Sequence, residues 1–153
     1  MPPTRLRRPL AAALLIVLAA PLAGQQLKGY EVADAGLFLA QDPVWIGGAV
    51  QAGWRPGGGT RLSLGLGLGR VDGRTSGRGE LLAHFILSPT RRSGVSPYAF
   101  GGAAGVVGPR EAAYLVLGLG LERGPGGASG WFLEGGVGGG ARIAAGWRWR
   151  VLK

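Results

Sequence analysis

The chain has 153 residues, of which 46% are hydrophobic and 32 are glycine, and its formal net charge is +9. That length suits one domain, and the hydrophobic content excludes a highly charged disordered polymer. The absence of cysteine excludes disulfides, cysteine-ligated zinc sites and thiol catalysis. The glycines are far above the ~7% of average proteins and follow no collagen triplet, so their abundance needs another structural explanation.

The first 24 residues predict a cleavable signal peptide. A basic segment precedes an apolar run over residues 10–20, and small residues follow up to Gly24. The run is shorter than the ~20 residues that a spanning helix needs, so a retained anchor helix is the less favoured alternative. Gln25 stands where a bacterial lipoprotein signal requires cysteine, which excludes lipidation there. We therefore expect residues 1–24 to direct export and residues 25–153 to form the mature protein.

After the leader, alternation of apolar and small residues predicts strands. Residues 61–70, RLSLGLGLGR, place leucine at every second position, and residues 114–123, YLVLGLGLER, repeat this period of two, which is typical of a strand. Eight strands are predicted, over residues 30–39, 44–55, 60–71, 79–88, 95–106, 112–123, 131–138 and 141–152. The connections are short and rich in Gly, Pro, Asp or Ser, so consecutive strands are expected to pair as antiparallel hairpins. Asp34 interrupts the apolar face of the first strand and leaves its register open.

Each predicted strand has one apolar face and one face of glycine and charge. In the last strand, for example, Trp147 and Trp149 flank Arg148. Five aromatic residues are assigned to the apolar face near strand ends, as an interfacial girdle requires: Trp54, Tyr98, Trp131, Trp147 and Trp149. The glycines on the opposite face would leave interior volume for arginine side chains.

Two closed barrels fit this pattern with opposite faces outward. In a soluble barrel the leucines would fill the interior and bind a small apolar ligand, in the manner of lipocalins, whereas in a membrane barrel they would face lipid. A water-facing surface made mostly of glycine suits a soluble protein poorly, while glycine with occasional Arg and Glu suits a narrow eight-stranded interior. The membrane barrel is therefore favoured, with the soluble exported barrel and a glycine-rich cross-strand polymer as alternatives.

The leader, strand number, alternation and aromatic placement resemble the small eight-stranded outer-membrane barrels of the OmpA and OmpX kind. The resemblance covers residues 25–153 and implies an all-β, antiparallel, up-and-down transmembrane β-barrel in the outer membrane of a Gram-negative-type bacterium. It also implies a monomer with a structural or membrane-integrity role, whose partners are outer-membrane lipid and the barrel assembly machinery. The chain departs from that family by ending on Leu152 and Lys153 rather than an aromatic residue, and by its short connections.

Charged residues on the glycine-bearing face predict an interior ion network. Its expected members are Arg61, Glu80, His84, Glu122, Glu134, Arg142, Arg148 and Arg150. If the last hairpin pairs Gly138 with Arg142, then Glu134 lies diagonal to Arg148, and we expect an ion pair between these two side chains. A structural network that satisfies buried charges is the favoured interpretation, and a proton or ion path is the alternative.

Arginines around two connections predict contacts with lipopolysaccharide. Arg70, Arg74 and Arg78 surround the connection expected at residues 72–77, and Arg110 lies on another connection at the same end of the barrel. Guanidinium groups bind phosphate bidentately, so these side chains could hold lipopolysaccharide headgroups. A solvated loop is the alternative.

Catalysis, cofactor binding and nucleic-acid binding are not predicted. His84 is the only histidine, and Ser88, four residues along the same strand, would lie more than ~13 Å away, too far for proton transfer. A serine from a neighbouring strand stays open as a partner. The glycines complete no phosphate-binding motif, and export with dispersed arginines argues against nucleic acid. We therefore expect no catalytic residue, no cofactor and no metal.

Overall fold

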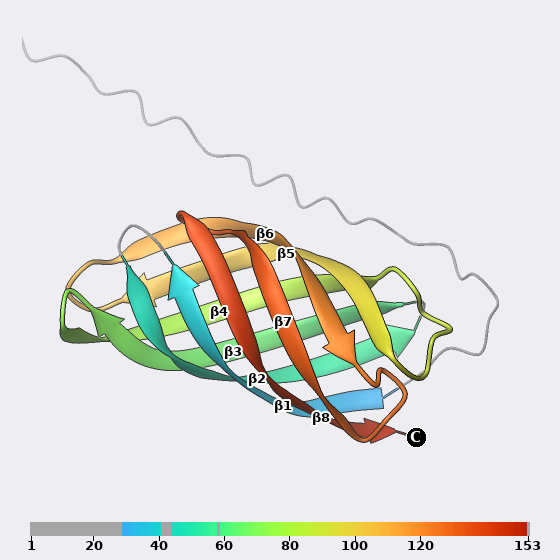
Figure 1. Cartoon of the computed structure of the whole chain (residues 1–153). Coiled ribbons are helices and arrows are strands. Elements are labelled where there is room, and N and C mark those ends of the chain that lie inside the picture. Colours follow the sequence, from blue (N-terminus) through green and yellow to red (C-terminus); the bar gives the residue numbers. More distant parts are fainter. Residues whose placement is uncertain (1–28, 41–43, 58, 153) are drawn as a thin grey trace, which may run out of the picture.

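The computed structural model describes residues 29–40, 44–57 and 59–152; the expected signal peptide lies outside them. Within these residues the chain forms eight strands that close into one barrel (Figure 1). They are β1 (Gly29–Ala40), β2 (Trp45–Gly57), β3 (Thr60–Val71), β4 (Arg74–Ile86), β5 (Val95–Val107), β6 (Ala112–Arg123), β7 (Ser129–Val137) and β8 (Ala141–Leu152). No helix in the described part of the chain is long and apolar enough to cross a membrane.

Every strand pairs antiparallel with the next one along the chain, and β1 also pairs with β8. The expected all-β, antiparallel, up-and-down arrangement is confirmed. Closure leaves no strand edge to recruit another chain, which argues against the cross-strand polymer. We call the rim formed by the connections after β1, β3, β5 and β7 the turn rim. The opposite rim, where β1 begins and β8 ends, is the terminal rim.

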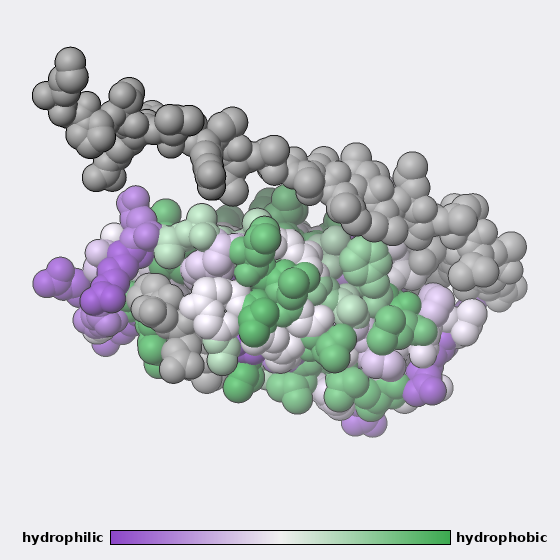
Figure 2. All heavy atoms as spheres, turned by 90° about the horizontal axis from the view of Figure 1, so that it is seen from above, coloured by the Kyte–Doolittle hydropathy of each residue, from purple (hydrophilic) through white to green (hydrophobic). Residues whose placement is uncertain are grey.

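The outer face of the barrel is apolar and the inner face is polar. Leu115, Leu68 and Leu66 are 78%, 73% and 64% exposed, whereas alternate positions on the same strands are buried. Figure 2 shows hydrophobic side chains over the middle of the barrel and hydrophilic ones gathered toward its ends. The leucines of β3 and β6 therefore do not line an interior site, and the expectation of a ligand bound among them inside the barrel is wrong.

Strand β4 begins earlier than the sequence predicts. Only Asp72 and Gly73 connect it to β3, and both have positive φ, 51° and 74°. That pair of left-handed residues defines a type I′ hairpin turn, for which Asp-Gly is a preferred sequence. The connection expected at residues 72–77 is therefore wrong, and Arg74 and Arg78 belong to β4.

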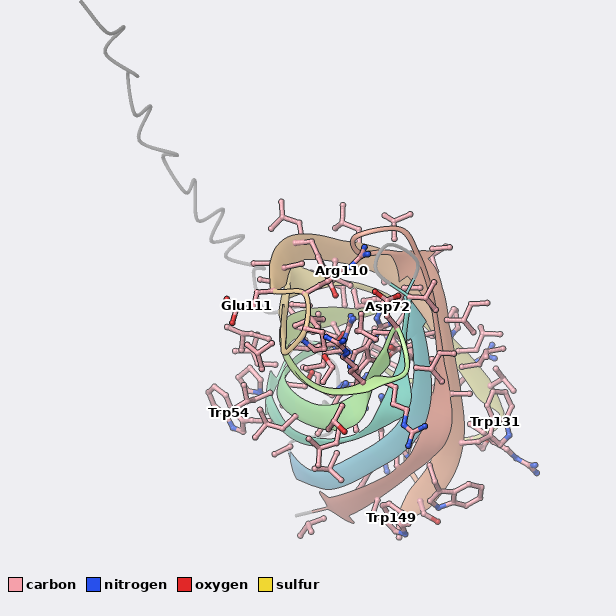
Figure 3. The ribbon with its side chains drawn as sticks, turned by 90° about the vertical axis from the view of Figure 1, so that its left-hand side faces the viewer. Trp54, Asp72, Arg110, Glu111, Trp131 and Trp149 are labelled. Atoms are coloured by element: carbon pink, nitrogen blue, oxygen red, sulfur yellow. The ribbon has the colours of Figure 1, made fainter. Side chains whose placement is uncertain are left out.

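Strand β5 turns its aromatic residues inward. Tyr98 and Phe100 are 0% and 2% exposed, so assigning Tyr98 to the outer girdle was wrong. The remaining girdle members, together with Phe85, lie outward in the half of the barrel nearer the terminal rim. Figure 3 shows Trp54, Trp131 and Trp149 projecting around the outside of the ring. Among the side chains that the structure describes, no aromatic residue lies outward near the turn rim.

Interior glycines accommodate aromatic rings rather than arginines. A Cβ at Gly69 would lie 2.7 Å from the Trp45 ring, and one at Gly120 would overlap the Tyr98 ring. Inward rings from one strand thus occupy the space that glycine leaves on the next. Glycines of β3 and β6 thus lie against the inward rings of the preceding strands, β2 and β5.

The first strand contains a register shift between Glu31 and Asp34. After the shift Asp34 pairs with Gln51 of β2 and Arg148 of β8, both of which are interior positions. A β-bulge of this kind changes which residues of a strand share a face. The interruption that Asp34 causes in the sequence pattern therefore corresponds to an irregularity in the strand.

Candidate functional site

The structure buries all eight residues expected in the interior network, each 6% exposed or less: Arg61, Glu80, His84, Glu122, Glu134, Arg142, Arg148 and Arg150. Two further arginines join them. Arg55 at the end of β2 is 7% exposed and Arg78 on β4 is 4% exposed. Arg55 follows Trp54 of the apolar face, so alternation along the strand puts Arg55 on the inner face. Arg78 was assigned to the outside because β4 was expected to begin only at residue 79.

One part of the network centres on Glu122, near the terminal rim. Its Oε2 accepts from Arg61 at 3.0 Å, Arg148 at 2.5 Å and Arg150 at 3.2 Å, and its Oε1 accepts from Arg55 at 3.2 Å. These arginines come from β2, β3 and β8, and Glu122 comes from β6. One carboxylate therefore links strands on opposite sides of the barrel through charge-assisted hydrogen bonds.

The other part connects Glu80 and Glu134. Arg142 donates to Glu134 Oε2 at 2.8 Å and to Glu80 Oε2 at 3.2 Å, and Arg78 donates to Glu80 Oε1 at 2.5 Å. The Tyr98 hydroxyl donates to Glu134 Oε1 at 2.8 Å. This chain of contacts joins β4, β5, β7 and β8 across the middle of the barrel.

The expected ion pair between Glu134 and Arg148 is wrong, because the last hairpin has a different register. The structure pairs Gly136, rather than Gly138, with Arg142. Arg142 thereby becomes the diagonal neighbour of Glu134, and Arg148 lies opposite Gly130, where it reaches Glu122.

Aromatic rings fill the space between the ion pairs. The Arg148 guanidinium lies 4.8 Å from the centre of the Phe132 ring and 5.6 Å from that of Tyr98. Arg142 lies 4.9 Å from the Phe100 ring centre, and Arg78 lies 5.6 Å from that of Trp45. Cation–π contact with buried rings gives these arginines stabilisation beyond their carboxylates. The interior is thus packed with guanidinium groups and aromatic rings.

His84 contacts a serine on the neighbouring strand. Its Nε2 lies 3.1 Å from Ser63 Oγ, and its Nδ1 accepts from Arg61 Nε at 3.1 Å and also from Arg61 Nη2. Guanidinium nitrogens only donate, so Nδ1 must be the acceptor and neutral His84 carries its proton on Nε2. In that tautomer Nε2 donates to Ser63 and cannot take the serine proton, so this pair lacks the general base that a nucleophilic serine needs.

The turn rim carries the cations expected to contact lipopolysaccharide, with one exception. Arg70 and Arg74 are exposed, and Arg110 is paired with Asp72 at 3.1 Å, with both side chains more than half exposed. Figure 3 shows Asp72 and Arg110 together at this end of the barrel, with Glu111 projecting away from them. Arg78 was wrongly included, because its side chain lies inside the barrel on Glu80.

Metal ligands do not gather in the described part of the chain. Within it, no group of three or more His, Cys, Asp or Glu side chains is placed to hold a metal ion. Each interior carboxylate that the structure describes contacts arginine instead. The chemistry of this interior is therefore that of ion pairing between fixed charges.

An apolar outer face, a charged interior and closed antiparallel topology define this chain as a small up-and-down β-barrel. No family model and no curated protein sequence matches it. Among solved structures, it is similar to the N-terminal β-barrel domain of Pseudomonas aeruginosa OprF, with a TM-score of 0.62 and 17% sequence identity. That likeness covers 83% of this chain and 100% of the OprF domain, and it establishes a shared fold.

Proposed function

We propose that this protein is a small outer-membrane β-barrel with a structural or membrane-integrity role and an interior closed by its ion network. The observation that carries the proposal is the inverted polarity of the barrel. Leu115 is 78% exposed on the outside, while Arg61 and Glu122 are 0% exposed on the inside. Water would favour the reverse arrangement, whereas lipid-facing strands require an apolar exterior.

The outer face supports this environment in two further ways. Exposed tryptophans of β2 and β8 lie toward the terminal rim, where an interfacial aromatic belt would meet lipid headgroups. Every strand is paired on both sides, so no backbone edge has to be buried in hydrocarbon. The export signal expected at residues 1–24 supplies a route to the outer membrane, and the likeness to the OprF barrel domain agrees with this class of fold.

The contacts inside the barrel support a closed structural element rather than a channel or an enzyme. Arg148 and Arg142 lie among carboxylates and aromatic rings from several strands, leaving their guanidinium groups no access to solvent. Neutral His84 carries its proton on Nε2, so this nitrogen cannot accept the proton of Ser63 as a general base would. We therefore propose no catalytic activity, no cofactor and no nucleic-acid partner. The partners proposed are outer-membrane lipid and the barrel assembly machinery, and the barrel acts as a monomer.

Fractionation and gel mobility test this proposal together. The expressed protein should sediment with the outer membrane, and in detergent gels the unboiled protein should migrate differently from the boiled protein. In planar bilayers the purified protein should produce no large, stable single-channel currents. Release by osmotic shock without a mobility shift would refute the membrane barrel, and stable currents would refute its closed interior.

A further inference from the structure

We propose that the outer face of β2, β3 and β4 binds an acyl chain of lipid A, and that Arg70 at the turn rim holds a phosphate of the same molecule. The inference rests on the outer-membrane barrel proposed above. It names the lipid that one part of the barrel surface recognises.

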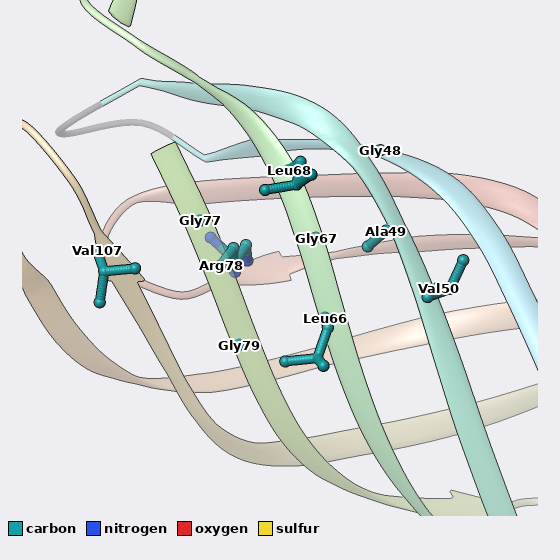
Figure 4. Close-up of a pocket in the computed structure, with 10 residues that line it drawn as sticks. All are labelled: Gly48, Ala49, Val50, Leu66, Gly67, Leu68, Gly77, Arg78, Gly79 and Val107. Atoms are coloured by element: carbon teal, nitrogen blue, oxygen red, sulfur yellow. The ribbon is translucent and has the colours of Figure 1, made fainter. Parts of the chain in front are cut away.

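The acyl chain would occupy a groove of about 780 Å³ on the outer face. Val50, Leu66, Leu68 and Val107 line the groove with outward apolar side chains, and Gly77 and Gly79 line it from β4 (Figure 4). Arg78 of β4 also lines it, but its side chain points into the barrel and pairs with Glu80. The groove is open along the outer face, as a site for one side of an extended acyl chain requires. The four apolar side chains are 61–73% exposed, so a ligand in the groove would contact them directly.

The fold does not require the glycine at position 79. Gly79 is not among the glycines with positive φ, and a Cβ there would meet nothing nearer than Leu66 Cδ2 at 4.0 Å. Interior glycines differ, because Gly120 and Gly69 directly face the rings of Tyr98 and Trp45. Gly79 therefore leaves a hollow on a face where β3 carries leucine, and a bound apolar chain would use that hollow.

A cationic site lies at the turn-rim end of the groove. Arg70 follows Leu68 by two positions on the same face of β3, a rise of about 7 Å. It is exposed and pairs across the sheet with Thr75, which is also exposed. Within the described residues Arg70 has no ion-pair partner. A guanidinium beside a hydroxyl can donate several hydrogen bonds to one phosphate.

The position of this site favours lipid A over a phospholipid. The outward tryptophans lie toward the terminal rim, whereas the turn rim presents Arg70 and Arg74. Asp72, the nearest carboxylate along the chain, is paired with Arg110, so it does not neutralise them. In an outer-membrane barrel inserted with its terminal rim toward the periplasm, the turn rim lies in the outer leaflet, where phosphate-bearing lipid A is the main lipid.

The experiment is a lipid titration of the refolded protein in detergent, followed by native mass spectrometry. The probes are purified lipid A, phosphatidylglycerol and phosphatidylcholine. Lipid A should bind most tightly, and Gly79→Leu, which fills the groove, and Arg70→Gln, which removes the cation, should each weaken it about tenfold. Gly135→Leu on the outer face of β7 and Arg123→Gln at the terminal rim are matched controls that should leave lipid A binding unchanged.

Each outcome decides between specific possibilities. Equal binding of phosphatidylglycerol with the same dependence on Arg70 would refute lipid A as the ligand. Unchanged lipid A binding in Arg70→Gln would refute the site, even if Gly79→Leu failed to fold. A heat-dependent gel shift of each variant reports folding separately. A wild-type protein without that shift would refute the proposed membrane barrel itself, whereas a shift without lipid selectivity would refute this inference alone.

Discussion

Glu122 contacts four arginines through its two carboxylate oxygens, and its side chain is completely buried. Three of the contacts converge on Oε2, so the oxygen that Arg61 uses is shared with Arg148 and Arg150. Guanidinium groups stay charged when buried, and they therefore need a nearby negative charge. Glu122 therefore holds arginines of β2, β3 and β8 beside one another in the barrel interior.

Glu122→Gln preserves the shape of this side chain and removes its charge. We expect the free energy of unfolding to fall by about 3–5 kcal/mol, because the arginines lose their shared partner in a buried site. Urea titration of the protein in lipid vesicles, followed by tryptophan fluorescence, measures the change. Glu111→Gln, an exposed carboxylate at the turn rim, is the control and should alter stability by less than ~0.5 kcal/mol. Equal effects of the two changes would show that Glu122 is dispensable.

The residues of the interior were largely predictable from strand parity, but their partners were not. Alternation assigns Glu122 and Arg148 to the inner face without any knowledge of the fold, because neighbouring positions are apolar. Which carboxylate each arginine reaches depends on the register of the strands and on closure of the barrel. In the last hairpin Arg142 pairs with Gly136 rather than with Gly138, and this shift of two residues places Arg142 instead of Arg148 beside Glu134. The tautomer of His84 likewise depends on Arg61 lying beside it.

At the scale of single strands, parity separates two faces but does not always say which one points inward. In β5 one face carries Tyr98 and Phe100 and the other carries alanine and glycine. Hydrophobicity alone would turn the rings toward the apolar outer face of the barrel. Both rings point inward, where the Tyr98 hydroxyl donates a hydrogen bond to Glu134 and the Phe100 ring packs against the Arg142 guanidinium. These partners come from β7 and β8, so a reading of β5 by itself could not identify them.

Gly120→Ala tests the packing of β6 against β5. The added methyl group would overlap the Tyr98 ring. This ring cannot move freely because it is stacked on His84 and its hydroxyl is hydrogen-bonded to Glu134. We expect a loss of about 1–3 kcal/mol in the free energy of unfolding, as for other overpacked interiors. The same urea titration measures it.

The matched control is Gly135→Ala, since a Cβ at that exposed position meets nothing within 4 Å. A comparable loss for both variants would mean that glycine is needed for backbone reasons throughout the sheet. In that case the contact between Gly120 and Tyr98 would not explain the glycine of β6.

At the scale of the whole molecule, the barrel has an apolar outer face between two rims of different chemistry. The terminal rim is bordered by outward tryptophans, and the turn rim by exposed arginines. The sequence predicted the apolar band, because the leucine alternation of β3 and β6 is uninterrupted. The sequence did not predict that the two rims differ. Tyr98 was expected outside but lies inside, and β4 was expected to begin after Arg78 but begins at Arg74.

Leu117→Arg tests whether this outer band lies in lipid. Leu117 is 62% exposed near the middle of β6, whereas Val44, adjoining β2 at the turn rim, is 50% exposed. In a bilayer, arginine at the midplane should cost about 2–4 kcal/mol of stability and arginine near the interface about 0–1 kcal/mol. Unfolding in lipid vesicles should therefore show a much larger loss for Leu117→Arg than for the control, Val44→Arg. On a water-exposed surface both substitutions would change stability by less than ~0.5 kcal/mol, so a dependence on depth identifies the environment that the leucines face.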